Sequence, residues 1–505
     1  MENNIGLKPE KNFSRLDTAY AFAMLICGFL YWNLIHLYML GAGVTLFTVV
    51  LVAVSYIYLS RSGVKQNTGS IICLIIIGFS AAHFALFDNQ FICWLNFMFI
   101  SVAFVYWICL STGRRIDNKL SVYIIGDAVK QGLSMPFLNF GCCASGIIGF
   151  AKNKKSQGIV AAFLGILIFL PLLAAVIRLL SAADWAFENF MAKVFDFINI
   201  ENIMTYIWQF IIGMPVAFYL YGIIYGNVKG RYADRLTTGA VDRAAKSIKI
   251  APKTTIYSAL TAFNAIYLIF FVVQAVYLFS AFNGYLPEAY TYAAYARRGF
   301  FELCTVAGIN LSILLISQLT VKREHGEEPK ALKVEIITIA LFTILLITTA
   351  LSKMIMYINA YGLTQLRVYT SWFMIILLLI FVAVFMRQIK KFNSARIIIA
   401  GFIIMFMALL YGNVDGQIAK YNISRYEAGT LATFDINAIT GLSNAAVPYM
   451  YDLYLRTDDL EMRTALAEAI SDMGARERGM ITVYIKGFRD FNYQRYQADE
   501  IRRRL

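Results

Sequence analysis

Long apolar stretches separated by short polar segments fill most of this chain. Eleven of these runs lack charged residues in their interior and extend for roughly 17 residues or more, enough to cross a hydrocarbon core of about 30 Å as a helix. The runs are continuous and do not alternate every second residue, so they predict helices and not barrel strands. The predicted spans cover residues 18–38, 41–60, 69–87, 90–112, 157–178, 203–227, 256–282, 300–320, 334–352, 368–387 and 396–412.

The composition agrees with this pattern and sets the domain organisation. Of 505 residues, 59% are hydrophobic, and the mean hydropathy is +0.62. No soluble core could hide that much apolar surface from water. We therefore predict an all-α, polytopic transmembrane bundle over residues 18–412, with a cytoplasmic N-terminal segment, 1–17, and a small extracytoplasmic helical tail, 413–505. No small-residue cleavage site follows the first run, which indicates a retained span and not a signal peptide.

The distribution of Lys and Arg predicts the orientation of the bundle. With the N-terminus inside, the inner segments hold 27 of the 45 basic residues, the short outer segments 6 and the tail 12. Cytoplasmic loops carry the excess of basic residues in membrane proteins. The pattern thus predicts a bacterial plasma-membrane protein whose N-terminus lies inside and whose tail lies outside.

Two segments are predicted to lie at the membrane surface, near 119–151 and 184–200. Residues 131–151 carry no charge and could cross, but they are rich in Gly, Pro, Ser and Asn. Counting them as a span would also place every later basic loop outside. Residues 184–200 mix aromatic and charged positions, a pattern typical of an amphipathic helix on the outer surface.

The tail reads as soluble helix. Residues 443–456 and 459–473 predict a helical pair, in which Asp458 caps the second helix and Gly474 ends it. Residues 489–505 are basic, aromatic and predicted helical. The buried face expected for the second helix consists of Leu460, Leu466, Ile470 and Met473.

Familiar catalytic signatures are missing from the sequence. The three histidines, His36, His83 and His325, are far apart and suggest neither a zinc site nor a His-based triad. No Gly-Lys-Ser/Thr loop is present to bind a nucleotide phosphate. The seven cysteines fall in apolar or interfacial stretches and have no C-x-x-C spacing. We therefore assign no catalytic residue, metal or cofactor. The missing signatures favour a protein that is not an enzyme.

A basic inner loop predicts contact with membrane lipid. Its charges can hold anionic lipid head groups or an acidic protein partner, although ordinary topogenic charge explains them as well. No nucleic-acid-binding module accompanies them, so nucleic acid is not an expected partner. The predicted head-group or partner contacts are Arg231, Arg235, Arg243, Lys246 and Lys249.

Polar and aromatic residues gather at the predicted outer ends of the last spans. Arg can form bidentate hydrogen bonds and Tyr offers stacking surface, so the cluster could recognise an anionic or sugar-like ligand. Alternatively, it is a hydrogen-bonded clasp that fixes the tail to the bundle, since desolvated charges at helix ends persist mainly when they are paired. The cluster comprises Arg297, Arg298, Glu302, Lys353, Tyr357, Tyr361, Arg367, Asn413, Asp415, Tyr421, Asn422 and Arg425.

Several stretches around this cluster resemble a bacterial integral-membrane family. They are YARRGFFEL at 295–303, AYGLTQLRVY at 360–369, NVD at 413–415 with IAKYN at 418–422, and LSNAAVP at 442–448. The family is domain of unknown function 4173, a relative of family 4153. The family's pattern for the last stretch is Leu-Ser-x-Asp-Ala-Val-Pro, so Asn444 and Ala445 stand in place of its x-Asp pair. The resemblance implies a bacterial cytoplasmic membrane protein but no activity.

Three functional hypotheses remain open on the sequence. The leading one is an envelope accessory or sensor component, whose outward cluster and tail engage a ligand or an envelope or signalling protein partner. The second is a secondary transporter or lipid carrier, suggested by Pro171 and Pro215 within apolar runs. The third is a membrane enzyme acting on an envelope substrate, with Glu302 or Asp415 as acid or base.

The predicted orientation can be tested with alkaline phosphatase, which is active only outside the cytoplasm. Fused after Leu505, the reporter should be active, and fused after Lys65, in a predicted inner loop, it should be inactive. The physical reason is the one-sided distribution of basic residues. An inactive fusion after Leu505 that is expressed at the same level would place the tail in the cytosol and contradict the prediction.

Overall fold

The computed structural model describes residues 13–117, 120, 123–151, 169, 172–173, 175–184, 187–188, 190–191, 200–232, 252–283, 292–321, 330–431, 436–481 and 487–505. These residues form helices and no β-strand, which confirms the predicted all-α class. The first helices are α1 (Arg15–Leu34), α2 (Ala42–Arg61), α3 (Thr68–Leu86), α4 (Gln90–Thr112), α5 (Ile124–Val129), a π-helical turn (Lys130–Ser134), α6 (Met135–Leu138), α7 (Phe140–Ala151) and α10 (Ile200–Lys229). They are followed by α12 (Lys253–Asn283), α13 (Tyr292–Thr320), α14 (Lys330–Tyr361), α15 (Gln365–Ile389) and α16 (Ser394–Tyr411).

Nine helices in the described part of the chain are long and apolar enough to cross a membrane. They include α2, α3, α4, α10, α12, α14, α15 and α16. The ninth is the stretch Gly126–Gly149, which we predict to lie at the membrane surface. The expected first span corresponds to α1, which carries Asp17 and Asn33 and is not one of the nine. The expected span 157–178 falls mostly outside the described residues.

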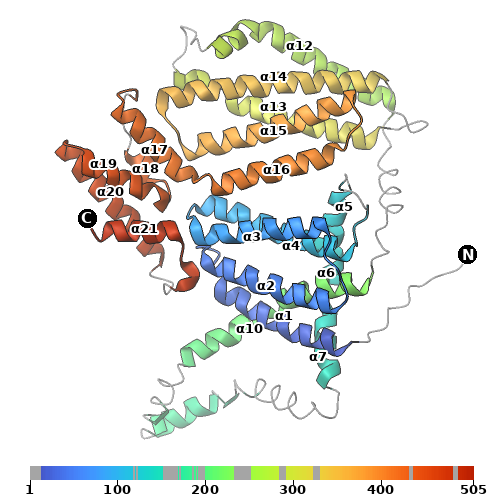
Figure 1. Ribbon diagram of the computed structural model, residues 1–505, viewed down its shortest axis with the longest axis vertical. Coiled ribbons are helices and arrows are strands. Elements are labelled where there is room, and N and C mark those ends of the chain that lie inside the picture. Colours follow the sequence, from blue (N-terminus) through green and yellow to red (C-terminus); the bar gives the residue numbers. More distant parts are fainter. Residues whose placement is uncertain are drawn as a thin grey trace, which may run out of the picture.

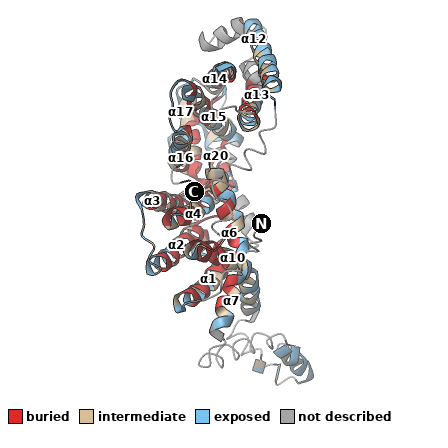
Figure 2. Cartoon of the chain, turned by 90° about the vertical axis from the view of Figure 1, so that its right-hand side faces the viewer, coloured by how far each residue is buried: buried red, intermediate tan, exposed pale blue. Residues whose placement is uncertain are grey.

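The spanning helices run side by side in two groups (Figure 1). One buried cluster joins α1, α2, α3 and α4 to α7 and α10. A second joins α12, α13, α14 and α15. Helix α16 connects the groups, since its Phe406 and Leu410 pack with Ile92 of α4. Figure 2 shows buried residues between the helices and exposed ones on their outer faces. Large apolar side chains such as Ile26, Val102 and Ile404 lie on those outer faces, as lipid-facing residues do.

A close crossing of α1 and α10 holds the first group together. A Cβ added to Gly28 would lie 2.3 Å from the backbone oxygen of Gly213. A Cβ added to Gly213 would lie 2.5 Å from the backbone oxygen of Gly28. Two glycines that face each other let the helix backbones approach, and such contacts drive helix association in lipid because the hydrophobic effect does not.

The segment from α5 to α7 lies across the ends of α1 and α10 that are far from the tail. Gln131 accepts a hydrogen bond from Asn227 at 2.6 Å, near the end of α10. Fifteen residues further on, the backbone oxygen of Gly146 accepts one at 3.5 Å from Thr18, near the start of α1. Figure 1 shows α5, α6 and α7 running crosswise to the spans. The stretch Gly126–Gly149 is also apolar and long enough to cross the membrane. Its placement at the membrane surface therefore stays a prediction. The other predicted surface segment, 184–200, lies almost entirely outside the described residues.

The tail forms a compact helical unit at one end of the bundle (Figure 1). Its core contains residues of α17, α19, α20 and α21, among them Ile423, Met450, Leu466 and Ala498. The elements of the tail are α17 (Val414–Glu427), α18 (Ile436–Thr440), a 3-10 turn (Asn444–Ala446), α19 (Val447–Arg456), α20 (Leu460–Ile481), a second 3-10 turn (Phe488–Asp490) and α21 (Tyr493–Arg502).

Three details of the tail differ from the sequence prediction. The backbone N–H groups of Glu461 and Met462 donate to Asp459, so Asp459 and not Asp458 caps α20. The helix continues past Gly474, where a Cβ would lie 2.7 Å from the Arg502 side chain. The glycine therefore makes room for α21 and does not end a helix. Leu460 is 77% exposed, so it does not belong to the buried face.

The close contact of Gly28 with Gly213 predicts that two Gly→Ala substitutions have opposite effects on the stability of the protein. Gly28→Ala should destabilise the protein by about 1–3 kcal/mol, because its methyl group forces two backbones apart. Gly78→Ala in α3 meets nothing within 4 Å and should be neutral or slightly stabilising, since Ala is the better helix former. Thermal unfolding in detergent micelles measures both. Equal stability of the two variants would show that α1 and α10 do not cross at this point.

Candidate functional site

Two buried aspartates mark the place where the tail meets the bundle. Asp88 lies in the short connection between α3 and α4, and Asp415 lies in the first turn of α17. Their exposed fractions are 5% and 1%. Because a carboxylate removed from water must be compensated by hydrogen bonds or opposite charge, the partners of these two residues define the site. We call them and their direct partners the tail junction.

Asp88 is bound by three side chains of the tail, all more than 350 residues away along the chain. Arg495 of α21 donates from Nη2 to Oδ1 at 2.6 Å, which forms a buried ion pair. Asn492 donates to the same oxygen at 2.8 Å, and Asn444 donates to Oδ2 at 2.5 Å. The backbone N–H of Asp88 in turn donates to Gln494 at 3.0 Å. This connection between α3 and α4 is therefore enclosed by the end of the chain.

Asp415 joins both groups of spanning helices to the tail. Asn89, at the start of α4, donates to Oδ2 at 2.8 Å. Gln365, at the start of α15, donates to Oδ1 at 2.8 Å. The backbone N–H of Ser443 in the tail donates to Oδ2 at 3.0 Å. The position of Asp415 in the first turn of α17 also suits a negative charge, because the positive end of the helix dipole lies there.

Further contacts extend the junction over the ends of the spans that lie next to the tail. The side chain of Asn422 bonds both the N–H and the C=O of Leu363, at 2.7 and 2.8 Å. Asp490 lies 3.0 Å from Nδ1 of His36, in the connection between α1 and α2. The N–H of Ala42 donates to the backbone oxygen of Phe491 at 2.9 Å. His36 is thus a contact between bundle and tail.

The backbone is shaped to allow this approach. Asn413, which directly precedes α17, has a φ of 44°, and its side-chain oxygen accepts a hydrogen bond from Gln494 at 2.8 Å. Gly362 has a φ of 75°, and a Cβ there would lie 2.5 Å from the Asn422 side chain. The glycine is required on both grounds, because a side chain would be strained and would also collide.

The predicted outer cluster divides into two parts. Asp415, Asn422 and Arg425 contact the bundle directly, the last through a 2.8 Å bond from Nη2 to the backbone oxygen of Asn359. Asn413 bonds instead to Gln494 within the tail. Arg425 also donates to the Tyr421 hydroxyl at 2.9 Å. These contacts have the form of the predicted clasp.

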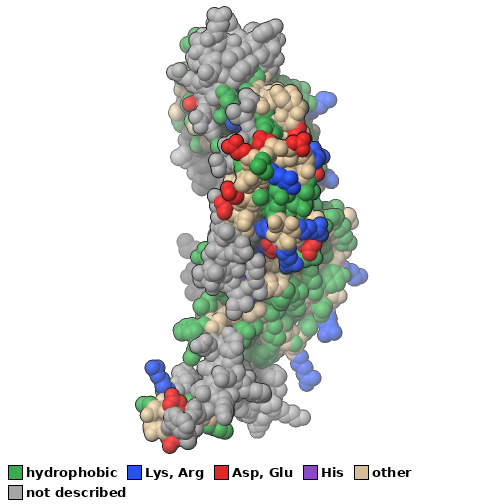
Figure 3. Space-filling view, turned by 90° about the vertical axis from the view of Figure 1, so that its left-hand side faces the viewer, with side chains coloured by type: hydrophobic (Ala, Val, Ile, Leu, Met, Phe, Trp, Pro, Cys, Tyr) green, Lys and Arg blue, Asp and Glu red, His purple; other side chains and the backbone are tan. Residues whose placement is uncertain are grey.

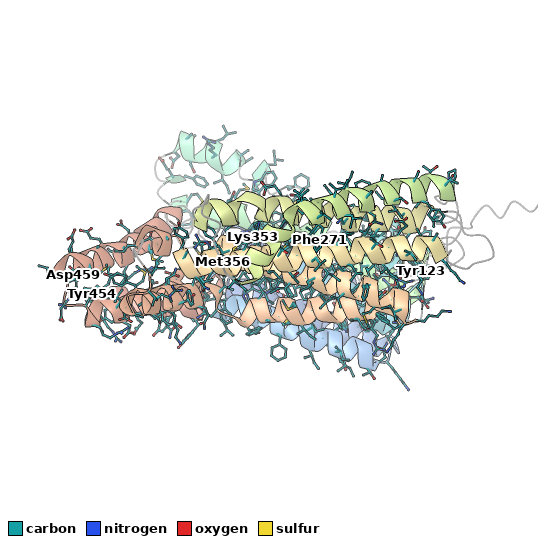
Figure 4. All side chains as sticks on the ribbon, turned by 90° about the horizontal axis from the view of Figure 1, so that it is seen from above. Tyr123, Phe271, Lys353, Met356, Tyr454 and Asp459 are labelled. Carbon is teal, nitrogen blue, oxygen red and sulfur yellow. The ribbon has the colours of Figure 1, made fainter. Side chains whose placement is uncertain are left out.

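The other part lies at the tail end of α14 and the start of α15. The Arg367 guanidinium lies 4.0 Å from the centre of the Tyr357 ring and donates to the backbone oxygen of Tyr361 at 3.0 Å. Figure 4 shows Lys353 near the tail end of the bundle. Glu302 of α13 is exposed and interacts electrostatically with Lys353. Arg, Lys and Tyr side chains therefore share this end of the second helix group.

Most of the remaining predicted site residues lie outside the described part of the chain. Arg297 and Arg298 belong to α13, but their side chains lie outside the described part, as do Arg235, Arg243, Lys246 and Lys249. Arg231 is only 6% exposed, and its Nε donates to Asn139 at 3.1 Å. This bond joins the residues after α10 to Asn139, between α6 and α7. The expected contact with lipid head groups or a partner stays a prediction.

Sequence reasoning missed half of the tail junction. Asp88 was hidden in a three-residue connection, yet it is the only acidic residue between Asp17 and Asp117. A lone carboxylate between two apolar spans is a signal that a basic partner must lie elsewhere in the chain. Nothing in the sequence singles out Arg495 among the twelve basic residues of the tail as that partner.

Chemically, the tail junction holds parts of the chain together. Both oxygens of each carboxylate accept hydrogen bonds from side chains of other parts of the chain or from its backbone. Within the described residues, no three His, Cys, Asp or Glu side chains are placed to hold a metal ion. The fold and this junction define a polytopic helical membrane protein with a helical tail fixed across one end of its bundle.

Comparison with known proteins agrees with that class and gives a family. The sequence profile described as "Domain of unknown function (DUF4153)" matches residues 71–453. The chain belongs to this family. The matched range includes Asp88 and Asp415 and ends before α21, which carries Arg495. No curated protein and no solved structure matches the chain.

The buried ion pair predicts a large penalty for removing either partner alone. Asp88→Asn and Arg495→Met should each lower the free energy of unfolding by about 3–5 kcal/mol, because one charge is left buried without its partner. The double variant should cost clearly less than the sum of the two. Equilibrium unfolding in mixed micelles measures this double-mutant cycle.

The exposed ion pair between Asp452 and Arg456 is the matched control. Asp452→Asn and Arg456→Met should leave the unfolding curve unchanged, because water screens this pair. Additive losses at Asp88 and Arg495 would contradict the proposed ion pair.

Proposed function

We propose that this protein is an accessory or sensor component of the bacterial cell envelope, with its N-terminus in the cytoplasm and its tail outside the plasma membrane. The observation that supports the proposal is the attachment of the tail to both helix groups through Asp88 and Asp415. A tail that only covered loop ends would not need two buried carboxylates, which are costly unless fully compensated. Attachment at two points fixes the position of the tail. The surface of the tail that faces away from the bundle can then be presented to a partner in one orientation.

The face of the tail turned away from the bundle suits a basic partner. Figure 3 views the molecule from the tail end and shows acidic side chains on this face. Among them, Glu427 and Asp452 pair with Arg456 at 2.7 Å. Leu455 and Leu460 of α19 and α20 are exposed beside these acids. Apolar anchors with a charged rim are typical of protein interfaces. The exposed acidic residues are Glu427, Asp452, Asp458, Asp459, Glu461, Glu468 and Asp472.

The second part of the outer cluster is proposed to bind a small anionic ligand. Arg367 on Tyr357, with Lys353 one turn before that tyrosine on α14, supports this role. The same stretch, 360–369, carries the resemblance to domain of unknown function 4173, so we propose that this chain is most like that branch. A ligand here would contact α14 and α15 beside the residues that hold α17, which offers a route from binding to tail position.

The enzyme hypothesis has less support. Asp415 accepts three hydrogen bonds and is 1% exposed, so it is poorly placed to exchange protons with a substrate. Glu302 is exposed and faces Lys353, which is compatible with a role in binding.

The partner proposal is tested with a photo-crosslinking amino acid at Leu460 in the full-length protein in cells. We expect one dominant crosslinked protein, identified by mass spectrometry. Its yield should fall at least about fivefold when Asp458, Glu461 and Glu468 are changed to Lys, because charge complementarity governs encounter with a partner. Changing the exposed Arg503 and Arg504, which directly follow α21, to Glu is the matched control and should leave the yield unchanged. Equal yields in all three proteins would exclude this face as a partner surface.

A further inference from the structure

A pocket lies at the end of the bundle that is opposite to the tail. Its volume is about 480 Å³, and it is lined by Lys130, Leu133, Ser134, Met135, Phe137, Leu138 and Tyr232. Pockets of about 300–1,000 Å³ are the size that small ligands occupy. Tyr123, just before α5, is labelled at this end in Figure 4. The pocket thus belongs to the corner where the α5–α7 segment packs against the end of α10.

The backbone around the pocket is irregular on both sides. Lys130–Ser134 form the π-helical turn, and three of the lining residues come from it. Single π-helical turns inside α-helices are frequent at functional sites. On the other side, Tyr232 has a φ of 60°, a left-handed conformation that a tyrosine rarely adopts. Such strain is concentrated at ligand-binding positions. Two independent backbone features therefore point to the same pocket.

The charge at this corner is positive. Lys130 lines the pocket, although only 5% of its surface is exposed. The Arg231 guanidinium lies 5.6 Å from the centre of the Tyr232 ring. Arg114 lies against Gly230, where a Cβ would be 2.5 Å from its Nη2. Asp127 accepts the N–H of Ile116 at 2.8 Å and interacts electrostatically with Lys130, Arg115 and Asp117. These two carboxylates offset part of the charge. Among these described residues the cations still outnumber the carboxylates, four to two, which favours an anion.

The remaining lining is apolar and continues onto an exposed surface. Leu133 and Phe137 are 58% and 60% exposed, and Val129 and Leu138 lie on the same segment with more than a third of their surface exposed. An interfacial helix presents such side chains to acyl chains. A free phosphate or a small anion would leave them in contact with water. The combination of a cation with an apolar wall fits an amphiphile.

We propose that this pocket binds one anionic phospholipid of the membrane leaflet at that end. Its phosphate lies near Lys130 and Ser134, and an acyl chain lies along Leu133 and Phe137. Basic pockets between helices are known to hold lipid head groups in this way. The site goes beyond the proposed function, because it lies at the opposite end from the tail and involves none of the same residues.

The test is lipid titration of the detergent-purified full-length protein, followed by native mass spectrometry. The probes are phosphatidylglycerol, phosphatidylcholine and glycerol phosphate. We expect phosphatidylglycerol to bind the unsubstituted protein more tightly than phosphatidylcholine, and glycerol phosphate not to compete. Lys130→Met should weaken phosphatidylglycerol binding about tenfold, the loss of one charge-assisted contact. Lys333→Met, at an exposed lysine of α14 at the same end, is the matched control and should bind as the unsubstituted protein does.

A second variant keeps the test decisive if Lys130→Met does not fold. Ser134→Trp fills the pocket from its wall and should weaken the binding of phosphatidylglycerol without removing any charge. The proposal is overturned if phosphatidylglycerol binds equally to the unsubstituted protein and to Ser134→Trp. It is also overturned if glycerol phosphate competes fully, since the site would then take a free anion. Equal affinity for phosphatidylglycerol and phosphatidylcholine would also overturn the proposal, because the pocket would then not distinguish an anionic lipid from a zwitterionic one.

Discussion

Two carboxylates without access to water impose the main constraint on this molecule. An ionised aspartate in a buried position is stable only when donors surround it. The donors that bind the side chains of Asp88, between α3 and α4, and Asp415, in α17, come from other segments of the chain. Arg495, Asn492 and Asn444 reach Asp88 from the tail. Asn89, Gln365 and Ser443 reach Asp415 from three separate parts of the chain. The tail must therefore fold onto the bundle for either charge to be compensated.

This constraint explains how two helix groups with separate cores form one body. Their apolar clusters are joined mainly through α16, and in lipid the burial of apolar side chains contributes little to holding helices together. Hydrogen bonds at the ends of the helices therefore contribute to holding the two helix groups together. Asn89 belongs to the first group and Gln365 to the second, and one carboxylate binds both. At the opposite end, the buried Asp17 of α1 binds Lys229 of α10 at 3.0 Å and Tyr58 of α2 at 2.7 Å, all within the first helix group. The irregular α5–α7 segment at that end forms the proposed lipid pocket.

The sequence located eight of the nine candidate spans of the described residues, since a charge-free run of this length has few alternatives to a membrane helix. The predicted spans 18–38 and 300–320 are not among the nine, and the ninth candidate, Gly126–Gly149, was predicted to lie at the membrane surface. The sequence also located Asp415 and Asn422, because polar residues directly after a span stand out. It could not identify Arg495, which lies 407 residues from Asp88, because pairing over that distance leaves no local pattern. The end of α20 was misjudged for a related reason. Gly474 has the residue type of a helix terminator, whereas its role is to admit Arg502 from another helix.

Hydrogen exchange measured by mass spectrometry on the unsubstituted protein and on Asp415→Asn tests the central claim most directly. If this carboxylate joins both helix groups to the tail, exchange will accelerate together in residues 89–92, 363–369 and 443–450, which are far apart in the sequence. Exchange that changes only within the first turn of α17 would contradict the account, because each helix group would then hold its place without the shared carboxylate.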